Sequence, residues 1–175
     1  MLYDRNPCWT LISDKLAVRD YVARKIGGQY LPRLLWSGKD PEDITFETLP
    51  AKYVIKTNHG CGYNIFKISE KALDKDRTIR QLWKWLHKNF CRDELYGIQW
   101  AYKNIEPKIF IEEFLGKEEK IPRDYKFFCF SGRAEYALIT FDRYGNPRDK
   151  HFDRDFTPLD LWNGWEQYRG KISMP

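Results

Sequence analysis

A lysine and two glycines in one short stretch of the sequence are suited to bind phosphate. Within residues 52–68, a β-branched run ends in Lys56, and Gly60 and Gly62 follow in a loop before a second run of similar composition. This pattern predicts a strand, a loop and a second strand. Glycines let a backbone approach a ligand closely, and loop N–H groups and a lysine can converge on a phosphate. The same residues are also typical of an ordinary β-hairpin with a tight turn, so the pattern alone leaves both interpretations open.

A further candidate cation, Lys15, lies in the first turn of a predicted helix. Ser13 or Asp14 is expected to cap this helix, and the Gly27-Gly28 pair is expected to end it. A cation is slightly unfavourable at a helix N-terminus, so Lys15 is either solvated or placed for an anion. Local reasoning favours the solvated interpretation.

Two adjacent carboxylates, Glu112 and Glu113, close an apolar run that predicts a buried strand over residues 108–116. Burying a charge without a partner is costly, so the pair has two interpretations. It forms the edge of a functional site, or it lies just outside the sheet in water.

Polar and charged residues dominate the chain from residue 142 onward. Asp142, Arg143, His151 and Asp153 are interleaved with aromatics there. They are interpreted either as an acceptor-substrate site or as a solvated, salt-bridged loop. Asp153-x-Asp155 is formally a metal-binding pair of the glycosyltransferase type, but no convincing apolar strand precedes it.

These residues must be positioned by helices and strands, and the predicted order of those elements indicates an α+β fold with mainly antiparallel sheets and flanking helices. The predicted order is a helix, a strand, a hairpin, a helix, a strand, a hairpin and a tail without clear periodicity: residues 13–26, 31–36, 52–68, 78–90, 108–116, 124–141 and 156–175. Residues 37–50 are expected to form a loop, and residues 91–107 a connection. The sequence contains no P-loop motif, and the two glycines of the first hairpin lack the third glycine and the helix of a dinucleotide fingerprint.

Composition sets broad limits on function. The net charge of +5 without a run of five basic residues favours small anionic ligands over a dedicated nucleic-acid site. The four cysteines include no CxxC pair and form no zinc-type cluster with the three histidines. No signal peptide is recognised, and no apolar run approaches the ~20 residues of a membrane span, so a cytoplasmic protein with free thiols is expected.

The chain resembles the TupA-like family of the ATP-grasp superfamily, which is named for a teichuronopeptide biosynthesis protein. The resemblance extends over residues 3–170 and is carried by Ser13-Asp14-Lys15, residues 53–65, residues 111–115 and, most specifically, residues 124–132, and it continues through Asp142-Arg143 and residues 151–153. It implies an ATP-grasp fold, with residues 1–111 as the smaller lobe and residues 112–175 as the start of the larger lobe. The nucleotide would lie between the lobes.

The resemblance also implies roles for individual residues. Lys15 and Lys56 would contact the phosphates of the nucleotide. A flexible loop that contains His59, Gly60, Gly62 and Asn64 would cover those phosphates. The hinge that binds adenine and ribose would consist of Glu112, Glu113, Phe114 and Leu115, and Lys126 would be a further lysine that faces the site. The implied activity is ATP-dependent carboxylate–amine ligation through an acylphosphate, in the biosynthesis of cell-surface polysaccharide or teichuronopeptide. ATP would be the cofactor, with Mg²⁺ expected for a complete member, and the carboxylate and amine substrates are unknown.

The chain departs from the family pattern at its C-terminal end, where the segments that carry the metal ligands are absent. We therefore expect a truncated member with an incomplete large lobe, no metal site, weak nucleotide binding and little ligase turnover. Two alternatives stay open: a glycosyltransferase of polysaccharide biosynthesis, and a noncatalytic fragment that binds nucleotide or nucleic acid.

Overall fold

The structure is a computed structural model that describes residues 5–93, 97–117, 120–162, 164–170 and 172. The chain divides into two compact units, Met1–Leu115 and Gly116–Pro175. This division falls four residues after the lobe boundary predicted at residue 111, because β6 (Ile109–Glu113) pairs within the sheet of the first unit. The assignment of the units as lobes stays a prediction.

The first unit is built on a four-stranded antiparallel sheet with the order β1-β6-β2-β3. Its helices and strands, in chain order, are α1 (Cys8–Ser13), α2 (Ala17–Ile26), β1 (Leu34–Gly38), β2 (Tyr53–Thr57), β3 (Asn64–Lys67), α3 (Lys75–Leu86), β4 (Arg92–Asp93), β5 (Gly97–Ile98) and β6. The short strands β4 and β5 form a separate two-stranded sheet. The predicted hairpin of residues 52–68 and the predicted strand of residues 108–116 are confirmed.

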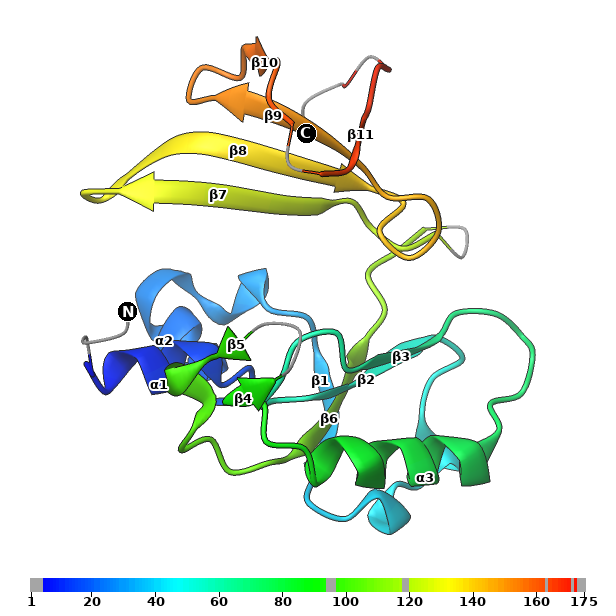
Figure 1. The fold of residues 1–175 in the computed structure, drawn as a ribbon. Coiled ribbons are helices and arrows are strands. Elements are labelled where there is room, and N and C mark those ends of the chain that lie inside the picture. The colour runs from blue at the N-terminus through cyan, green and yellow to red at the C-terminus, as the bar shows by residue number, and fades with distance from the viewer. Residues whose placement is uncertain (1–4, 94–96, 118–119, 163, 171, 173–175) are drawn as a thin grey trace. The chain divides into compact units, whose positions relative to one another are not determined.

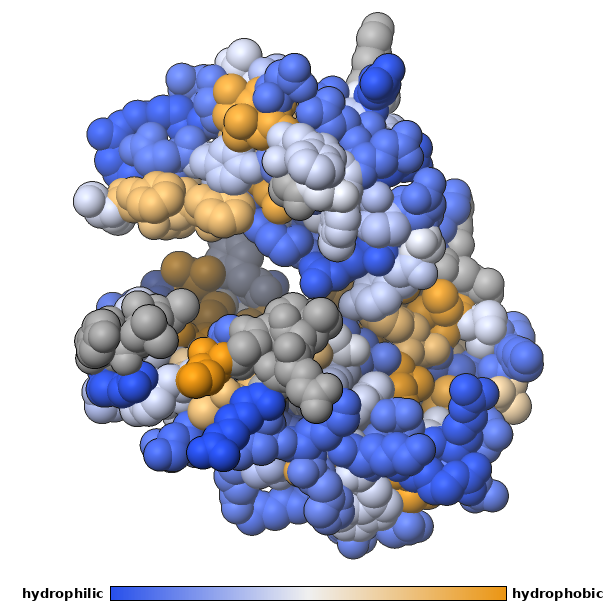
Figure 2. All heavy atoms as spheres, in the orientation of Figure 1, coloured by the Kyte–Doolittle hydropathy of each residue, from blue (hydrophilic) through white to orange (hydrophobic). Residues whose placement is uncertain are grey.

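Alternation along β2 and β6 gives this sheet one apolar face. Ile55, Ile109 and Ile111 pack on it against Leu82 of α3, and all four side chains have 0% exposure. Figure 1 shows α3 running along the sheet, and Figure 2 shows mainly hydrophilic residues over the outward side of that helix. The opposite face of the sheet is therefore the one on which Lys56 and Glu112 lie.

Two helix boundaries follow from side-chain caps. Asp14 confirms its predicted role, because its Oδ1 accepts hydrogen bonds from the N–H groups of Leu16 (2.8 Å) and Ala17 (3.1 Å) at the start of α2. The prediction that the next helix spans residues 78–90 was wrong at both ends. Asp74 caps α3 by accepting from the N–H of Arg77 at 2.9 Å, so the helix begins at Lys75, and it ends at Leu86.

The second unit is a sheet with the order β10-β9-β8-β7, and β11 pairs in parallel with β9. Its strands are β7 (Asp124–Phe130), β8 (Arg133–Phe141), β9 (Arg148–Asp153), β10 (Pro158–Leu159) and β11 (Glu166–Gln167). The predicted hairpin of residues 124–141 is confirmed, and its turn uses positive φ at Ser131 (49°) and Gly132 (79°). A core of Ala137, Ile139 and Phe152 holds the sheet together.

The interpretation of residues 142–153 as a solvated loop was wrong for residues 148–153, which form β9, and the tail without clear periodicity contains the short strands β10 and β11. β9 carries mostly polar residues, so its composition does not signal a strand, yet it pairs with β8 along its whole length. In the described residues, no helix combines the length and the apolar character that a bilayer crossing requires.

Candidate functional site

A charged pair lies on the sheet face of the first unit that is opposite α3. Lys56 of β2 donates a hydrogen bond from Nζ to Oε1 of Glu112 on the neighbouring strand β6. The Lys56 side chain is 26% exposed and that of Glu112 only 7%. The interpretation that both glutamates lie outside the sheet in water was wrong for Glu112, which is buried because cations compensate its charge.

The second cation beside Glu112 is Arg19 of α2. Its Nη1 lies 3.4 Å from Oε2 of Glu112, and its Nη2 donates to the carbonyl of Pro32. The sequence reasoning did not single out Arg19. A usable signal exists, because Arg19 follows Lys15 by four residues, the spacing that places two side chains on one side of a helix.

Lys15 joins the same region from the start of α2. Its Nζ donates to the carbonyl of Gly60, and its backbone N–H donates to the carbonyl of Asn58 at 3.2 Å. Burial lowers the pKa of Lys15, the charge of Cys61 raises it, and the charge of Lys56 lowers it further. The solvated interpretation of Lys15 was therefore wrong: the side chain is half-buried and bonded to the glycine loop.

The two loop glycines serve different purposes. A Cβ on Gly60 would lie 2.4 Å from the ring of Tyr63, so this glycine permits the ring to pack over the loop. Tyr63 in turn stacks on Trp85 of α3 with ring centroids 5.2 Å apart. Gly62 has a φ of +78° and nothing within 4 Å of an added Cβ, so its backbone faces open space.

The glycine loop offers backbone hydrogen-bond donors. Within the described part of the chain, no hydrogen bond engages the backbone N–H groups of Gly60, Cys61 and Gly62. Such consecutive N–H groups form concave anion sites in other loops. Cys61 and Gly62 are exposed and Gly60 is buried, so the donors open to a phosphate beside Lys15 are those of Cys61 and Gly62. Asn64 lies at the start of β3, where it pairs with Lys56.

His59 anchors the loop to α3. The side chain is 3% exposed, and its Nε2 lies 3.0 Å from the carbonyl oxygen of Trp85. Burial is the main cause that lowers the pKa of His59, and the Trp85 carbonyl raises it in part. The Nε2 side of the imidazole faces α3, and the predicted contact of His59 with a nucleotide stays a prediction.

Acidification is expected to destabilise the first unit through His59. Because its pKa in the folded chain lies below the unfolded value of about 6.5, the folded state binds fewer protons there. The stability from neutral His59 is complete above about pH 6.5 and is lost as the pH falls below that value. Urea unfolding should show a smaller loss between pH 7.5 and 5.5 in His59→Gln, which can still donate to Trp85, than in wild type. An identical pH dependence in both proteins would contradict this assignment.

The predicted hinge begins inside the sheet. β6 lies between β1 and β2, and the N–H of Glu113 donates to the carbonyl of Arg33 at 3.0 Å. The Glu113 carboxylate accepts from the N–H of Arg33 at 2.7 Å. Phe114 and Leu115 follow β6, and Leu115 is 61% exposed. Phe114 and Leu115 are therefore the two hinge residues whose backbone lies outside the sheet, whereas Glu112 and Glu113 belong to β6.

The remaining predicted residues lie in the second unit. Lys126 donates to Asp124 at 2.7 Å and contacts Thr140 at 3.4 Å, and Arg143 also donates to Asp124. These residues form an ion-pair cluster on β7 and its neighbours. The predicted role of Lys126 in nucleotide binding stays a prediction.

Asp142, Asp153 and His151 do not form one site. Asp142 accepts from the N–H of Asn146 at 2.9 Å, and Asp153 accepts from those of Asp155 (2.9 Å) and Thr157 (2.8 Å). Both aspartates therefore hold turns, which leaves Asp153 poorly suited to the metal pair of a glycosyltransferase. The part of the chain that the structure describes contains no group of three or more His, Cys, Asp or Glu residues that could hold a metal ion.

The fold and the site define a class of protein before any relative is considered. An α+β chain with antiparallel sheets brings two lysines to an open glycine loop, and this arrangement is consistent with an ATP-grasp-type protein. A family model described as TupA-like ATPgrasp matches residues 1–172, so the chain belongs to the TupA-like ATP-grasp family. Neither the curated proteins nor the solved structures gave a match.

Proposed function

We propose that the first unit binds the phosphates of ATP through Lys15, Lys56 and the backbone of residues 60–62. The observation that carries this proposal is the hydrogen bond from Lys15 to the carbonyl of Gly60, next to the exposed residues Cys61 and Gly62, whose backbone N–H groups no hydrogen bond among the described residues engages. The charge of Lys56 acts on Lys15, so the two cations belong to one region. Cations and convergent N–H groups are the donors that recognise phosphate.

Glu112 would act as a placeholder for phosphate at Lys56. A carboxylate and a phosphate are both anionic oxygen acceptors, and Lys56 is exposed enough to exchange one for the other. Arg19 would then hold the released carboxylate, because it already lies 3.4 Å from its other oxygen. The ion pair therefore keeps the site compact until the nucleotide arrives.

The hinge supports a place for the base. The backbone groups of Phe114 and Leu115 lie beyond β6 and can donate to and accept from an adenine edge, and Glu113 lies near enough in sequence to reach the ribose. Mg²⁺ would come with the nucleotide phosphates, its preferred oxygen ligands, since the described residues offer no metal cluster.

Membership in the family supports a more specific role, which we include in the proposal. The chain would serve ATP-dependent carboxylate–amine ligation in the biosynthesis of a cell-surface polymer. ATP would supply the phosphoryl group that activates the carboxylate, and Lys15 and Lys56 would neutralise charge that develops on the phosphoryl oxygens.

Calorimetric titration of MgATP into the full chain tests the proposal. Wild type is expected to bind, and Lys56→Ala is expected to bind about ten- to a hundredfold more weakly, because a charge-assisted hydrogen bond contributes about 1.5–3 kcal/mol. Lys84→Ala is the matched control, since Lys84 lies exposed on α3 away from the loop. The control should bind like wild type. Equal affinity of Lys56→Ala and wild type would refute the nucleotide assignment.

A further inference from the structure

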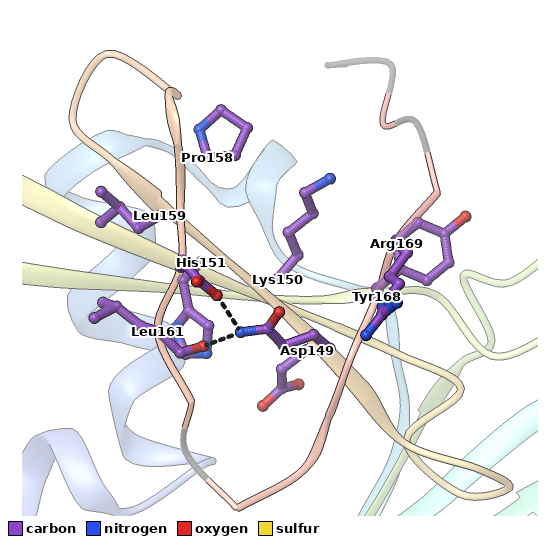
Figure 3. A pocket seen from close by; sticks show the side chains of 10 residues that line it. Asp149, Lys150, His151, Pro158, Leu159, Leu161, Tyr168 and Arg169 are labelled. Carbon is purple, nitrogen blue, oxygen red and sulfur yellow. Dashed lines mark hydrogen bonds between the residues drawn. The ribbon is translucent and has the colours of Figure 1, made fainter.

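A cavity lies within the second unit, at the outer edge of β9. One edge of β9 pairs with β8, and β10 and β11 share the other: β10 lies opposite His151 and Phe152, and β11 opposite Arg148 and Asp149. An open cavity of about 360 Å³ lies at this edge of β9, lined by residues of β10, of β11 and next to them. Figure 3 shows Pro158, Leu159 and Leu161 on one side of it and Tyr168 and Arg169 on the other.

A buried imidazole lines this cavity with one nitrogen unsatisfied. His151 is 3% exposed, and its Nε2 is buried without a hydrogen-bond partner among the described residues. Its other nitrogen, Nδ1, is hydrogen-bonded to the hydroxyl of Tyr136. Leaving a buried polar atom unpaired costs about 1–3 kcal/mol, so the fold retains His151 at a cost that a bound polar group would offset.

The Tyr136 contact fixes which hydrogen-bonding role Nε2 has. Burial lowers the pKa of His151 and raises that of Tyr136, so both groups are neutral near pH 7. The phenol is the stronger donor of the pair, so its O–H donates to Nδ1 and the ring proton resides on Nε2. His151, which lines the cavity, therefore has a buried N–H donor without a hydrogen-bond partner among the described residues.

An acceptor lies beside this donor. Asp149 precedes His151 by two residues on β9, which places both side chains on one face of the sheet, and it is 1% exposed. Figure 3 shows the two side chains near each other at the cavity. Gln167 closes the rim by donating to Asp160 (2.9 Å) and to the carbonyl of Leu161 (3.1 Å).

We propose that this cavity binds a hydroxyl-bearing small molecule, such as one sugar ring. A hydroxyl group can accept from the N–H of His151 and donate to the carboxylate of Asp149 at the same time. An ammonium group cannot accept from His151. A phosphate would set its negative charge against Asp149, the residue beside that donor, although the cations Lys150 and Arg169 also line the cavity. The apolar side chains of Leu159 and Leu161 suit the C–H faces of a ring, and the volume lies in the range of small-molecule sites.

Long-range ¹H–¹⁵N spectra of the histidine rings test this inference directly. The chain has three histidines, so the signals of His151 can be compared with those of His59 and His87 in one sample. D-Glucose, D-galactose, N-acetylglucosamine and D-glucuronate would be titrated to about 100 mM, far above a millimolar dissociation constant. At least one should shift the His151 signals saturably and leave those of His87 unchanged. No saturable shift with any of these sugars, or a larger saturable shift with methylammonium or inorganic phosphate, would overturn the inference.

Two variants separate binding from folding. His151→Ala should abolish saturable sugar binding measured by calorimetry. Tyr136→Phe keeps the aromatic ring but removes the hydroxyl that holds the proton of His151 on Nε2. This variant should weaken binding about three- to tenfold and change the ¹⁵N shifts of His151. Tyr125→Phe, on the exposed edge strand β7, is the matched control and should bind like wild type. Unchanged affinity in Tyr136→Phe would contradict the proposed donor role even if His151→Ala failed to fold.

The inferred site needs no nucleotide. A calorimetric titration of MgATP into the same protein measures nucleotide binding by the first unit independently. If sugar binding failed while MgATP still bound, or the reverse, each result could be interpreted separately.

Discussion

Glu112→Ala is expected to lower the free energy of unfolding by about 2–4 kcal/mol. Removing one partner of a buried ion pair leaves the other charge uncompensated, and Glu112 has two cationic partners. Lys56 loses its acceptor, and Arg19 keeps only the carbonyl of Pro32. The expected value lies at the lower end for buried pairs because Lys56 is 26% exposed and regains water. Urea unfolding followed by tryptophan fluorescence measures it.

The proposed exchange of carboxylate for phosphate adds a second expectation for Glu112→Ala. MgATP should stabilise this variant more than it stabilises wild type, because Lys56 no longer has to leave an internal partner before it binds phosphate. Glu70→Ala, an exposed glutamate on the surface of the same unit, is the matched control and should unfold like wild type. If Glu112→Ala were as stable as Glu70→Ala, the ion pair of Glu112 would contribute nothing to the free energy of unfolding. If MgATP stabilised Glu112→Ala less than wild type, Glu112 would be a nucleotide contact and not a placeholder.

The elements around the candidate site could be predicted because their sequence patterns are dense and local. β2, β3 and β6 each follow from short β-branched or aromatic runs, and the glycines between β2 and β3 mark their connection. The cap of α2 at Asp14 also follows from residue type and position. In these segments the local preference and the final fold agree.

Partners that are distant in sequence could not be predicted. Glu112 is buried because Arg19, 93 residues earlier in the chain, lies beside it, and no local pattern contains that distance. β9 shows the same limit: its polar residues suggested a loop, whereas pairing with β8 and β10 supplies the strand. Strand propensity depends on neighbours in space, so a short polar strand gives little signal on its own.

Residue type also did not reveal in which direction a side chain faces. His59 stands in the loop next to Gly60, and yet its ring contacts the end of α3. Asp142 and Asp153 have the chemistry of ligands but accept hydrogen bonds from turn N–H groups. Asp and His residues often satisfy the local backbone, and only the hydrogen bonds of the folded chain separate that use from a functional one.

Asn58→Ala is expected to destabilise the first unit by about 2–4 kcal/mol, because one fully buried side chain links three segments of the site. Its Nδ2 donates to Asp14 and to the carbonyl of Glu106, both at 3.0 Å, and its Oδ1 accepts from the N–H of Lys108 at 2.7 Å. With 0% exposure, the lost bonds cannot be replaced by water without opening the fold. The sequence pattern alone assigns no role to Asn58. Urea unfolding monitored by tryptophan fluorescence measures the loss.

The same substitution should also weaken MgATP binding, even under conditions where the variant is folded. Asp14 precedes Lys15 and caps α2, so loss of its bond to Asn58 loosens the position of the Lys15 amine beside the glycine loop. Asn58→Asp keeps the acceptor for Lys108 but sets a second carboxylate against Asp14, so it should be at least as destabilising as the alanine variant. Asn104→Ala, at an exposed position, is the matched control for both measurements. If Asn58→Asp were as stable as wild type, the bond to Asp14 would not hold α2 against the loop. The position of Lys15 would then depend on its own contact with Gly60 alone.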